Sequence, residues 1–385
     1  MSRIEELIEK LCPNGVEYKK LDEVCNFNRG TSMTSKNAIE GDVPVISGGQ
    51  KPAFYHNASN RPAGTITIAG SGAYAGYVAF WDKPIFCADS FSVDVKDDKI
   101  LDKKFLCYYL LNKQQDIYNK KTGAGIAHVH GKDIAKFKIP VPPLEVQCEI
   151  VHILDDFTLL SALLSAELKA RQKQYEYYNY NLLKFENIPY YTLEELCDIV
   201  DYRGKTPKKT NEGIFLVTAK NIRKGYIDYE KSQEFISEQD YAEVMRRGIP
   251  KVGDVLITTE APCGNVAQVD DENIALAQRV IKYRPKDNRL DSTFLKYILL
   301  GEEFQTKLNG KATGGTVKGI KGSILHKLTI PLPSIEEQRK IVKILDRFNK
   351  LCNDISEGLP AEINARQKQY EYYRDKILTF KMIGD

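Results

Sequence analysis

The stretch ARQKQYEYY at residues 170–178 occurs a second time, without a change, at residues 365–373. The residues upstream of the two copies also correspond. TGAGIAHVHGKDIAKFKIPVPPLEVQCEIVHILDDF at 122–157 aligns with TGGTVKGIKGSILHKLTIPLPSIEEQRKIVKILDRF at 313–348 at a constant offset of 191 residues. A repeat of this length indicates two duplicated domains and argues against a solenoid of short repeats.

The composition is that of a globular protein, and the length of 385 residues suggests two or three domains. Charged residues make up 28% of the chain but the net charge is only +3, so a surface that binds nucleic acid must be local. The eight cysteines include no C-x-x-C pair, which argues against a zinc ribbon and favours reduced thiols. The charged amphipathic start and the lack of an apolar run of about 18 residues predict a soluble intracellular protein.

Each repeat has a mixed segment of strands, turns and glycines, then a proline-rich phrase, then a long helical pattern. IPVPPLE at 139–145 and IPLPSIEE at 330–337 are expected to continue neither a strand nor a helix, and so to end the globular part. The predicted fold class is therefore α+β, with two globular domains joined by two helical regions. The predicted divisions are 1–143 for the first globular domain, 144–186 for the central helical spacer, 187–334 for the second globular domain and 335–385 for the C-terminal helical spacer.

Apolar residues recur at helical spacing from Ile150 to Leu168 and from Ile341 to Ile355. Each stripe is too narrow to bury itself, so we expect the two copies to pack on each other as an antiparallel coiled coil with a pseudo-twofold axis. Gly358 and Pro360 are expected to break the second helix near 357–361, whereas the first stays continuous. Ser334 is predicted to cap the second helix.

The globular segments differ between the repeats far more than the helices do. Alternating runs at 65–69 and 255–259 predict strands, and the stretches at 102–118 and 291–308 predict matching helices. Two domains with different surfaces on two nearly identical spacers are what a protein that reads two sites requires.

The sequence contains no recognisable catalytic constellation. VPPL at 141–144 lacks the polar first residue and the aromatic found in methyltransferases that act on DNA amino groups, and GGTVKGIKGS at 314–323 has Ile320 where a P-loop requires lysine. No G-x-S-x-G phrase occurs. His128 and His130 could share one side of a strand, but no third metal ligand is evident. We therefore expect no catalysis, no bound metal and no cofactor in this chain.

In combination these features resemble the specificity subunits of type I restriction-modification systems. The resemblance is carried by the IPxPxxExQ phrases at 139–147 and 330–338, the two helices containing ILD-x-F, the two ARQKQYEYY stretches, and YYRDKILTF at 372–380. It covers essentially the whole chain. It implies a prokaryotic cytoplasmic protein with two target-recognition domains, each reading one half of a bipartite asymmetric DNA sequence, and with paired helices that set the spacing and dock partners.

The resemblance also implies two modification subunits, which carry S-adenosylmethionine and methylate adenine, and two restriction subunits, which use ATP and magnesium. Two identical partners require two equivalent docking surfaces, which explains the repeated helices, whereas two different half-sites explain the diverged domains. LLSALLSAEL at 159–168 resembles an imperfect form of the tetrapeptide repeats that set the spacer length in some members. Half-sites about one turn apart lie on one face of DNA, within reach of a rigid helical pair.

Three alternatives remain open from the residues alone: a stand-alone DNA-binding regulator, a protein-binding scaffold, and an enzyme, which the missing motifs make the weakest. The basic clusters near 203–224 lie among Gly, Thr and Asn, and are either a solvated surface or contacts to bases and phosphates. The tyrosine clusters are predicted to pack on the sister helix and on a partner protein.

The predicted site residues are nominated at the level of loops and helix faces. In the first domain the predicted DNA contacts are Ser47, Gln50, Lys51, Tyr55, Arg61, Ser71, Tyr74, His128, His130 and Lys132. In the second domain they are Arg203, Lys205, Lys208, Lys220, Asn221, Arg223, Asn265, Gln278, Lys318 and Lys321. The predicted partner contacts are Arg171, Gln174, Tyr175, Tyr178, Arg366, Gln369, Tyr370 and Tyr373.

Overall fold

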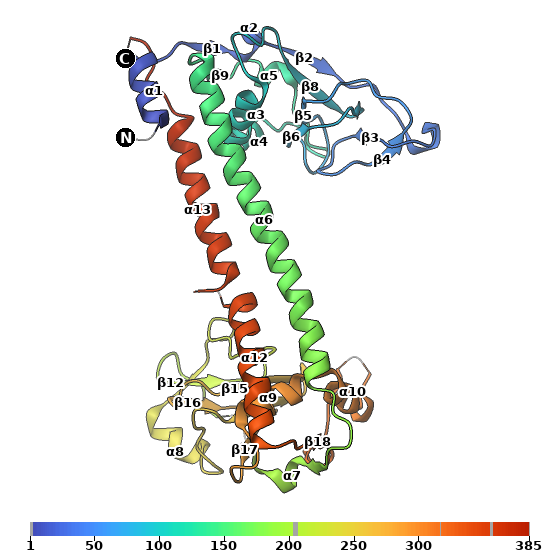
Figure 1. Cartoon of the computed structure of the whole chain (residues 1–385), viewed down its shortest axis with the longest axis vertical. Coiled ribbons are helices and arrows are strands. Elements are labelled where there is room, and N and C mark those ends of the chain that lie inside the picture. The colour runs from blue at the N-terminus through green and yellow to red at the C-terminus, as the bar shows by residue number, and fades with distance from the viewer. Residues whose placement is uncertain (1–2, 203–206, 316, 355–356, 385) are drawn as a thin grey trace. The chain divides into compact units, whose positions relative to one another are not determined.

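The computed structural model describes residues 3–202, 207–315, 317–354 and 357–384 (Figure 1). The chain forms two compact units. Unit 1 contains the residues up to Ser165 and those from Glu362 onward, and unit 2 contains Ala166–Ala361. Among the described residues, no helix combines the length and the apolar character needed to span a membrane.

Unit 1 contains three small sheets. The four-stranded antiparallel sheet has the order β2-β8-β5-β6, with β2 at Cys25–Arg29, β8 at Ser90–Val95, β5 at Thr65–Ala69 and β6 at Val78–Trp81. In the sheet β4-β3-β7, β3 (Val43–Ile46) is antiparallel to β4 (Phe54–His56) and parallel to β7 (Phe86–Cys87). The third pairs β1 (Tyr18–Lys20) with β9 (Lys138–Pro140). The helices are α1 (Arg3–Leu11), α2 (Leu21–Val24), η1 (Ser35–Asn37), α3 (Lys103–Asn112), α4 (Gln114–Tyr118) and α5 (Gly131–Ile134).

Unit 2 repeats this topology strand for strand. Its four-stranded sheet has the order β11-β17-β14-β15, with β11 at Cys197–Asp201, β17 at Val280–Pro285, β14 at Val255–Thr259 and β15 at Cys263–Gln268. The sheet β13-β12-β16 comprises Phe235–Ile236, Ile214–Val217 and Ile274–Leu276, and β10 (Tyr190–Thr192) pairs with β18 (Thr329–Pro331). The helices are α7 (Leu193–Leu196), η2 (Glu238–Asp240), α8 (Tyr241–Val244), α9 (Ser292–Leu300), α10 (Glu302–Lys311) and α11 (Gly322–Leu325). The internal repeat seen in the sequence is therefore also a structural repeat.

The predicted strands at 65–69 and 255–259 are confirmed as β5 and β14. Each predicted helix at 102–118 and 291–308 is instead a pair of helices, because the chain leaves helical geometry at Lys113 and at Gly301. The expectation that the proline phrases lie outside strands is wrong at their first residues. Ile139 and Pro140 belong to β9, where a two-stranded edge sheet tolerates the missing proline N–H.

The long helices follow the predicted pattern. α6 (Leu144–Leu182) is continuous over 39 residues, while the second helical region divides into α12 (Ile335–Asn353) and α13 (Leu359–Ile377). Ser334 caps α12, since its hydroxyl accepts from the backbone N–H of Glu337 at 3.3 Å. At the break, a Cβ on Gly358 would lie 2.6 Å from the carbonyl oxygens of Asp354 and Lys350, so the turn requires glycine.

A buried glutamine fixes the start of each long helix. The side chain of Gln147 donates to the carbonyls of Ile100 (2.8 Å) and Pro142 (2.7 Å) and accepts from the N–H of Asp102 (2.8 Å). Asp102 is the residue that caps α3. Gln338 makes the three equivalent bonds, to Arg289, Pro333 and Asp291, each at 2.8 Å. Both glutamines are fully buried, so each helix is tied rigidly to the globular part of its unit.

Aromatic contacts pair the helices antiparallel within each unit. In unit 1, Phe157 of α6 contacts Tyr370 and Tyr373 of α13, with ring centroids 6.1 and 5.9 Å apart. Ile150, which precedes Phe157 in the chain, and Ile377, which follows Tyr370, are both buried in the same hydrophobic core of unit 1. In unit 2 the equivalent residue of the other repeat, Phe348 of α12, contacts the tyrosine cluster of α6. The distances are 6.4 Å to Tyr175 and 5.3 Å to Tyr178.

Candidate nucleic-acid interface

Three loops of unit 1 meet beside the end of β5. Ser71 and His128 form an antiparallel β-bridge, and the N–H of Val129 donates to the carbonyl of Gly70 at 3.0 Å. The Ser71 hydroxyl donates to the carboxylate of Asp89, which comes from the segment before β8. We call residues 70–72, 89 and 122–130 the first loop edge. It presents hydroxyl, carboxylate and imidazole groups together, which are the groups that hydrogen-bond polar ligands.

Unit 2 has a second loop edge, formed by residues 259–260, 278–279, 313–315 and 317–321. Glu260 and Gly319 form the β-bridge here, and the N–H of Ile320 donates to the carbonyl of Thr259 at 3.0 Å. The carboxylate of Glu260 lies 3.1 Å from Nε of Arg279. Together with Lys321 these residues line an open cavity of about 460 Å³.

The first loop edge gathers several of the predicted DNA contacts. Ser71, His128 and His130 belong to it, and the two imidazole rings are nearly parallel with centroids 6.3 Å apart. Ser47 lies next to it, because a Cβ on the adjoining Gly48 would come within 2.4 Å of the Ser71 carbonyl. The remaining exposed residues among these predictions are Gln50, Lys51, Tyr55, Tyr74 and Lys132.

Arg61 has a different placement from the one expected of a DNA contact. Its Nε donates to the hydroxyl of Ser92 at 2.8 Å, and its terminal nitrogens donate to the carbonyls of Asn28, Arg29 and Asn60. The whole guanidinium is therefore used to hold the loops around β8 in place.

In unit 2, Gln278, Lys318 and Lys321 lie on the second loop edge, and Lys208 and Lys220 are exposed elsewhere. Arg203 and Lys205 lie outside the described residues. Asn221 is fully buried and its amide donates to the carbonyls of Asp228 and Ser232 at 2.9 and 3.0 Å.

Two further predicted residues of unit 2 also have partners within the unit. Arg223 pairs with Asp228 at 3.2 Å, and Asn265 donates to the carbonyl of Ile222 at 2.7 Å. Together with Asn221 these side chains brace the segment after β12, and Asn221 has no exposed atom to offer to a base. Residue type alone could not distinguish such supporting amides from exposed ones.

The predicted partner surface is reproduced in both repeats. Arg171 pairs with Glu167 at 2.7 Å and Arg366 pairs with Glu362 at 2.8 Å, and each also donates to a glutamine, Gln174 or Gln369, at 2.8 Å. Tyr175 and Tyr370 are half-buried against the phenylalanines described above, and Tyr178 and Tyr373 stack on the same rings.

Two further tyrosines of the predicted clusters, which were not among the nominated partner contacts, face outward from these helices. Tyr177 and Tyr372 are each 65% exposed and occupy the same position in the two repeats. They lie two residues from the inward-facing Tyr175 and Tyr370, and residues two apart on a helix do not share a face, as the prediction for the clusters requires. They are therefore the most accessible aromatic side chains of the repeated surface.

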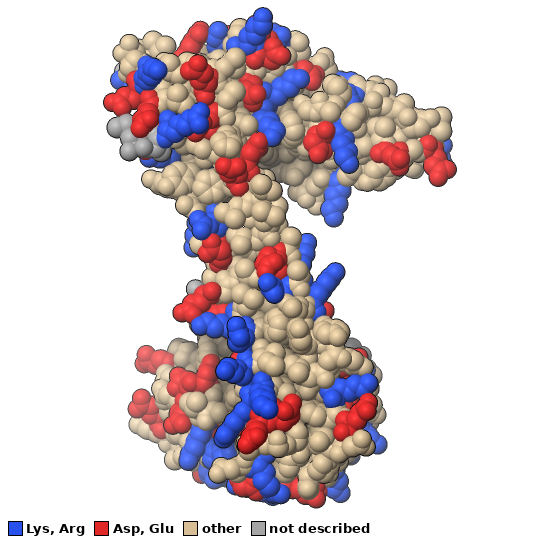
Figure 2. Space-filling model, in the orientation of Figure 1, with Lys and Arg blue, Asp and Glu red and all other residues tan. Residues whose placement is uncertain are grey.

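Basic side chains gather over α12, as Figure 2 shows. They are Arg339, Lys340, Lys343, Arg347 and Lys350, all exposed. The equivalent positions of α6 carry Cys148, Glu149, His152, Asp156 and Leu159. This asymmetry was not predicted, because the apolar stripes of the two helices correspond and only their outer faces differ.

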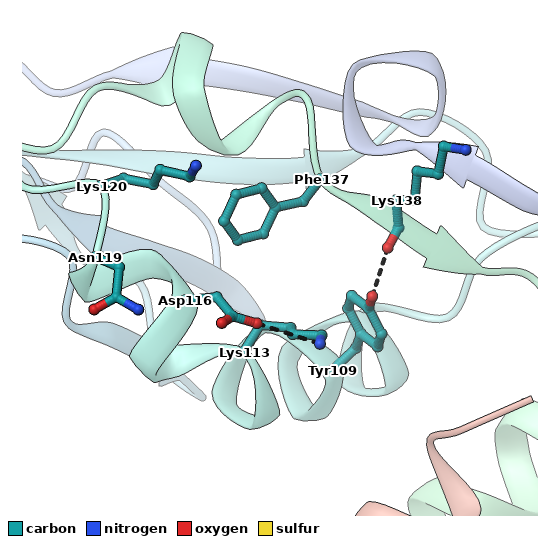
Figure 3. Close-up of a pocket in the computed structure, with 7 residues that line it drawn as sticks. All are labelled: Tyr109, Lys113, Asp116, Asn119, Lys120, Phe137 and Lys138. Carbon is teal, nitrogen blue, oxygen red and sulfur yellow. Dashed lines mark hydrogen bonds and ion pairs between the residues drawn. The ribbon is translucent and has the colours of Figure 1, made fainter.

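One hollow of unit 1, of about 420 Å³, is lined by Tyr109, Lys113, Asp116, Asn119, Lys120, Phe137 and Lys138 (Figure 3). Its single carboxylate, Asp116, is ion-paired with Lys113 at 3.2 Å, and Lys120 lies over the ring of Phe137. A hollow with one neutralised carboxylate offers no acid–base pair. Across the described residues, no cluster of three or more His, Cys, Asp or Glu side chains could hold a metal ion.

The buried thiols are not activated. Burial raises the pKa of the Cys25, Cys107 and Cys197 thiols to about 12, which disfavours the nucleophilic thiolate. Burial and a hydrogen bond to Asp155 raise the pKa of Tyr108 well above its ordinary value. These perturbed groups are structural, so they do not indicate a catalytic centre.

The family model for the type I restriction modification DNA specificity domain matches residues 13–171 and 186–365. The chain belongs to this family, which confirms the resemblance carried by the sequence motifs. It is the DNA-recognition subunit of a type I restriction-modification system, and such a subunit has no catalytic activity of its own.

The chain is similar to a putative type I restriction enzyme specificity subunit of Haemophilus influenzae, with 30% identity over 99% of this chain and 100% of that protein. It is 36% identical to a type I restriction enzyme specificity subunit of Escherichia coli over 63% of each chain. The crystal structure of a type I S subunit from M. genitalium has the same fold, with a TM-score of 0.62 at 18% identity, over 94% of this chain and 96% of that one.

Proposed function

We propose that unit 1 and unit 2 each read one half of a bipartite asymmetric DNA sequence, and that the repeated helix surfaces dock two copies of a modification subunit. The observation that carries this proposal is the contrast between the two kinds of surface. Arg171 and Arg366 make the same ion pair and the same glutamine bond in both repeats, whereas the loop edges present different side chains on the same backbone. A repeated surface fits a repeated partner, and a diverged one fits two different half-sites.

The chemistry is divided between this chain and its partners. S-adenosylmethionine is bound by the modification subunits, which methylate adenine, and ATP and magnesium are used by the restriction subunits. The loop edges supply hydrogen-bond donors and acceptors for base edges, and exposed lysines supply phosphate contacts. The basic face of α12 supports further phosphate contacts, which add affinity without reading sequence.

The proposal is tested by methylation mapping. The chain is co-expressed with the modification subunit of its own system, the complex is incubated with random-sequence DNA and S-adenosylmethionine, and modified adenines are located by sequencing. The expected result is one motif made of two short specific segments with a fixed gap. Reactions without this chain, and with this chain alone, are the controls and should give no methylation. A complex that forms but methylates no defined sequence would favour a protein-binding scaffold.

A further inference from the structure

Two residues occupy the same place in the two loop edges. In unit 1 the N–H of Gly70, just after β5, donates to the carbonyl of Asp89 at 3.3 Å. In unit 2 the N–H of Thr259, at the end of β14, donates to the carbonyl of Arg279 at 2.9 Å. Since β5 corresponds to β14 and β8 to β17 in the two sheets, Asp89 and Arg279 are structural equivalents.

Their side-chain partners are equivalent as well. Ser71 bridges to His128 in unit 1, and Glu260 bridges to Gly319 in unit 2, so Ser71 and Glu260 share one position. The Ser71 hydroxyl holds the Asp89 carboxylate, and the Glu260 carboxylate holds the Arg279 guanidinium. The same scaffold thus presents a carboxylate acceptor in one unit and a guanidinium donor in the other.

The pair in unit 2 is placed to meet a ligand. The side chain of Arg279 is 51% exposed and that of Glu260 is 43% exposed, beside the cavity that Lys321 also lines. Glu260 contacts Nε of Arg279, and within the described part of the chain the two terminal nitrogens of Arg279 have no hydrogen-bond or ion-pair partner. Arg279 also has a left-handed backbone with φ of 72°, which is rare for a residue other than glycine and is typical of functional positions.

We propose that Arg279 and Asp89 are base-reading residues at equivalent positions of the two half-sites, an inference that rests on the proposed function. The terminal nitrogens of Arg279 donate to O6 and N7 of a guanine in the major groove, while Glu260 fixes the plane of the guanidinium. The Asp89 carboxylate accepts from the exocyclic amino group of a cytosine, while Ser71 holds it. These are the pairings that the geometry of base edges favours for arginine and for a carboxylate.

The test uses the complex with the modification subunit and the methylation map of random-sequence DNA. Arg279→Ala is expected to remove the preference for G·C at one base pair of one half-site, a loss of roughly 5- to 150-fold in discrimination there. The other half-site should not change. Arg279→Gln should shift the preference at that pair towards A·T, because glutamine pairs with adenine. Asp89→Ala should relax one base pair in the opposite half-site.

Two matched controls and one conservative variant make the outcome decisive. Arg246→Ala and Asp116→Ala each remove an exposed ion-paired charge outside the loop edges and should leave the motif intact. Arg279→Lys keeps the positive charge but loses the planar guanidinium that can donate two hydrogen bonds to one guanine. DNA binding should therefore persist while the G·C preference falls.

An unchanged motif in Arg279→Ala would overturn the inference and leave the proposed function standing. A uniform loss across all sequences would also overturn it, since it would mark a phosphate contact. If the unaltered complex gave no motif, the proposed function itself would fail.

Discussion

Phe157 stacks on Tyr373 with ring centroids 5.9 Å apart and the planes inclined by 27°. Phe348 stacks on Tyr178 in the same manner, at 5.3 Å and 28°. Because Phe157 and Tyr178 belong to the first repeat and Phe348 and Tyr373 to the second, each unit is completed by a helix segment from the other repeat. Neither repeat contains all the contacts of one unit.

Phe157→Ala is therefore expected to destabilise unit 1, and Phe348→Ala unit 2. Each ring is partly buried, so the loss in the free energy of unfolding should be about 2 kcal/mol, below the value for a fully buried phenylalanine. Urea unfolding combined with limited proteolysis measures both units. Equal stability of the variants and the unaltered chain would show that these stacks contribute nothing.

Gln147→Leu should lower the stability of unit 1, although the leucine and glutamine side chains have similar volumes. It leaves two carbonyls and one N–H in the core without a partner, which we expect to lower the free energy of unfolding by about 3 kcal/mol. Gln338→Leu should have the same effect in unit 2. Gln174→Leu, which removes only a half-buried hydrogen bond from Arg171 on the helix, is the control and should change stability little. Thermal unfolding of the four proteins checks this, and wild-type stability in Gln147→Leu would contradict the anchoring role.

Tyr177 and Tyr372 are expected to contact the modification subunits, because both are exposed at the same position of the repeated helix surface. Native mass spectrometry should show two bound copies for the unaltered chain, one for Tyr177→Ala or Tyr372→Ala, and none for the double variant. Tyr180→Ala is a matched control, since its counterpart in the other repeat is Asp375 and it is 52% exposed. Two bound copies in the double variant would place docking elsewhere.

The buried thiols predict a loss of stability at high pH. The pKa of Cys25, Cys107 and Cys197 is raised by burial from 9.0 to about 12, so the folded chain retains protons that the unfolded chain releases. The contribution of these thiols to the free energy of unfolding is complete below pH 9. It is lost as the pH rises towards 12, by up to about 1.4 kcal/mol per pH unit for each thiol.

The same burial predicts selective alkylation. At pH 8, iodoacetamide should modify the exposed Cys148 and leave these three thiols intact until urea is added. Mass spectrometry identifies the modified cysteines, and labelling of Cys107 in the native chain would contradict the burial described.

Lys343→Ala tests the basic face of α12. If this face contacts phosphates, the variant should bind all DNA sequences more weakly and lower the slope of log K against log salt by about one. His152→Ala, at the equivalent position of α6, should leave the slope unchanged. A loss confined to one sequence would instead assign Lys343 to base recognition.

The repeat and the strands β5 and β14 could be predicted because they follow from the local pattern of residues. The helix break at Gly358 could be predicted because glycine and proline interrupt helices. The sequence did not predict that Pro140 ends a strand, since this depends on pairing with β1, more than a hundred residues away in the chain. Asp89 and Arg279 were missed for the same reason: only the sheet brings each beside its partner loop.

Asn221 is a residue that the sequence wrongly suggested to be accessible to DNA. Its residue type and its polar neighbours suited a DNA contact, but tertiary packing buries it completely. Exposure depends on the whole fold, so the sequence could nominate loops but could not separate the reading side chains from the bracing ones.

The most direct test of the central account is to replace residues 198–328 with residues 26–137, so that both globular positions carry the first domain. Residues 26–137 and 198–328 start and end at equivalent points of the repeat, just after the first residue of β2 or β11 and just before β9 or β18. The methylation motif of the complex with the modification subunit should then contain two copies of the half-site that unit 1 reads. Retention of the original asymmetric motif, by a chimera that still assembles, would contradict the account.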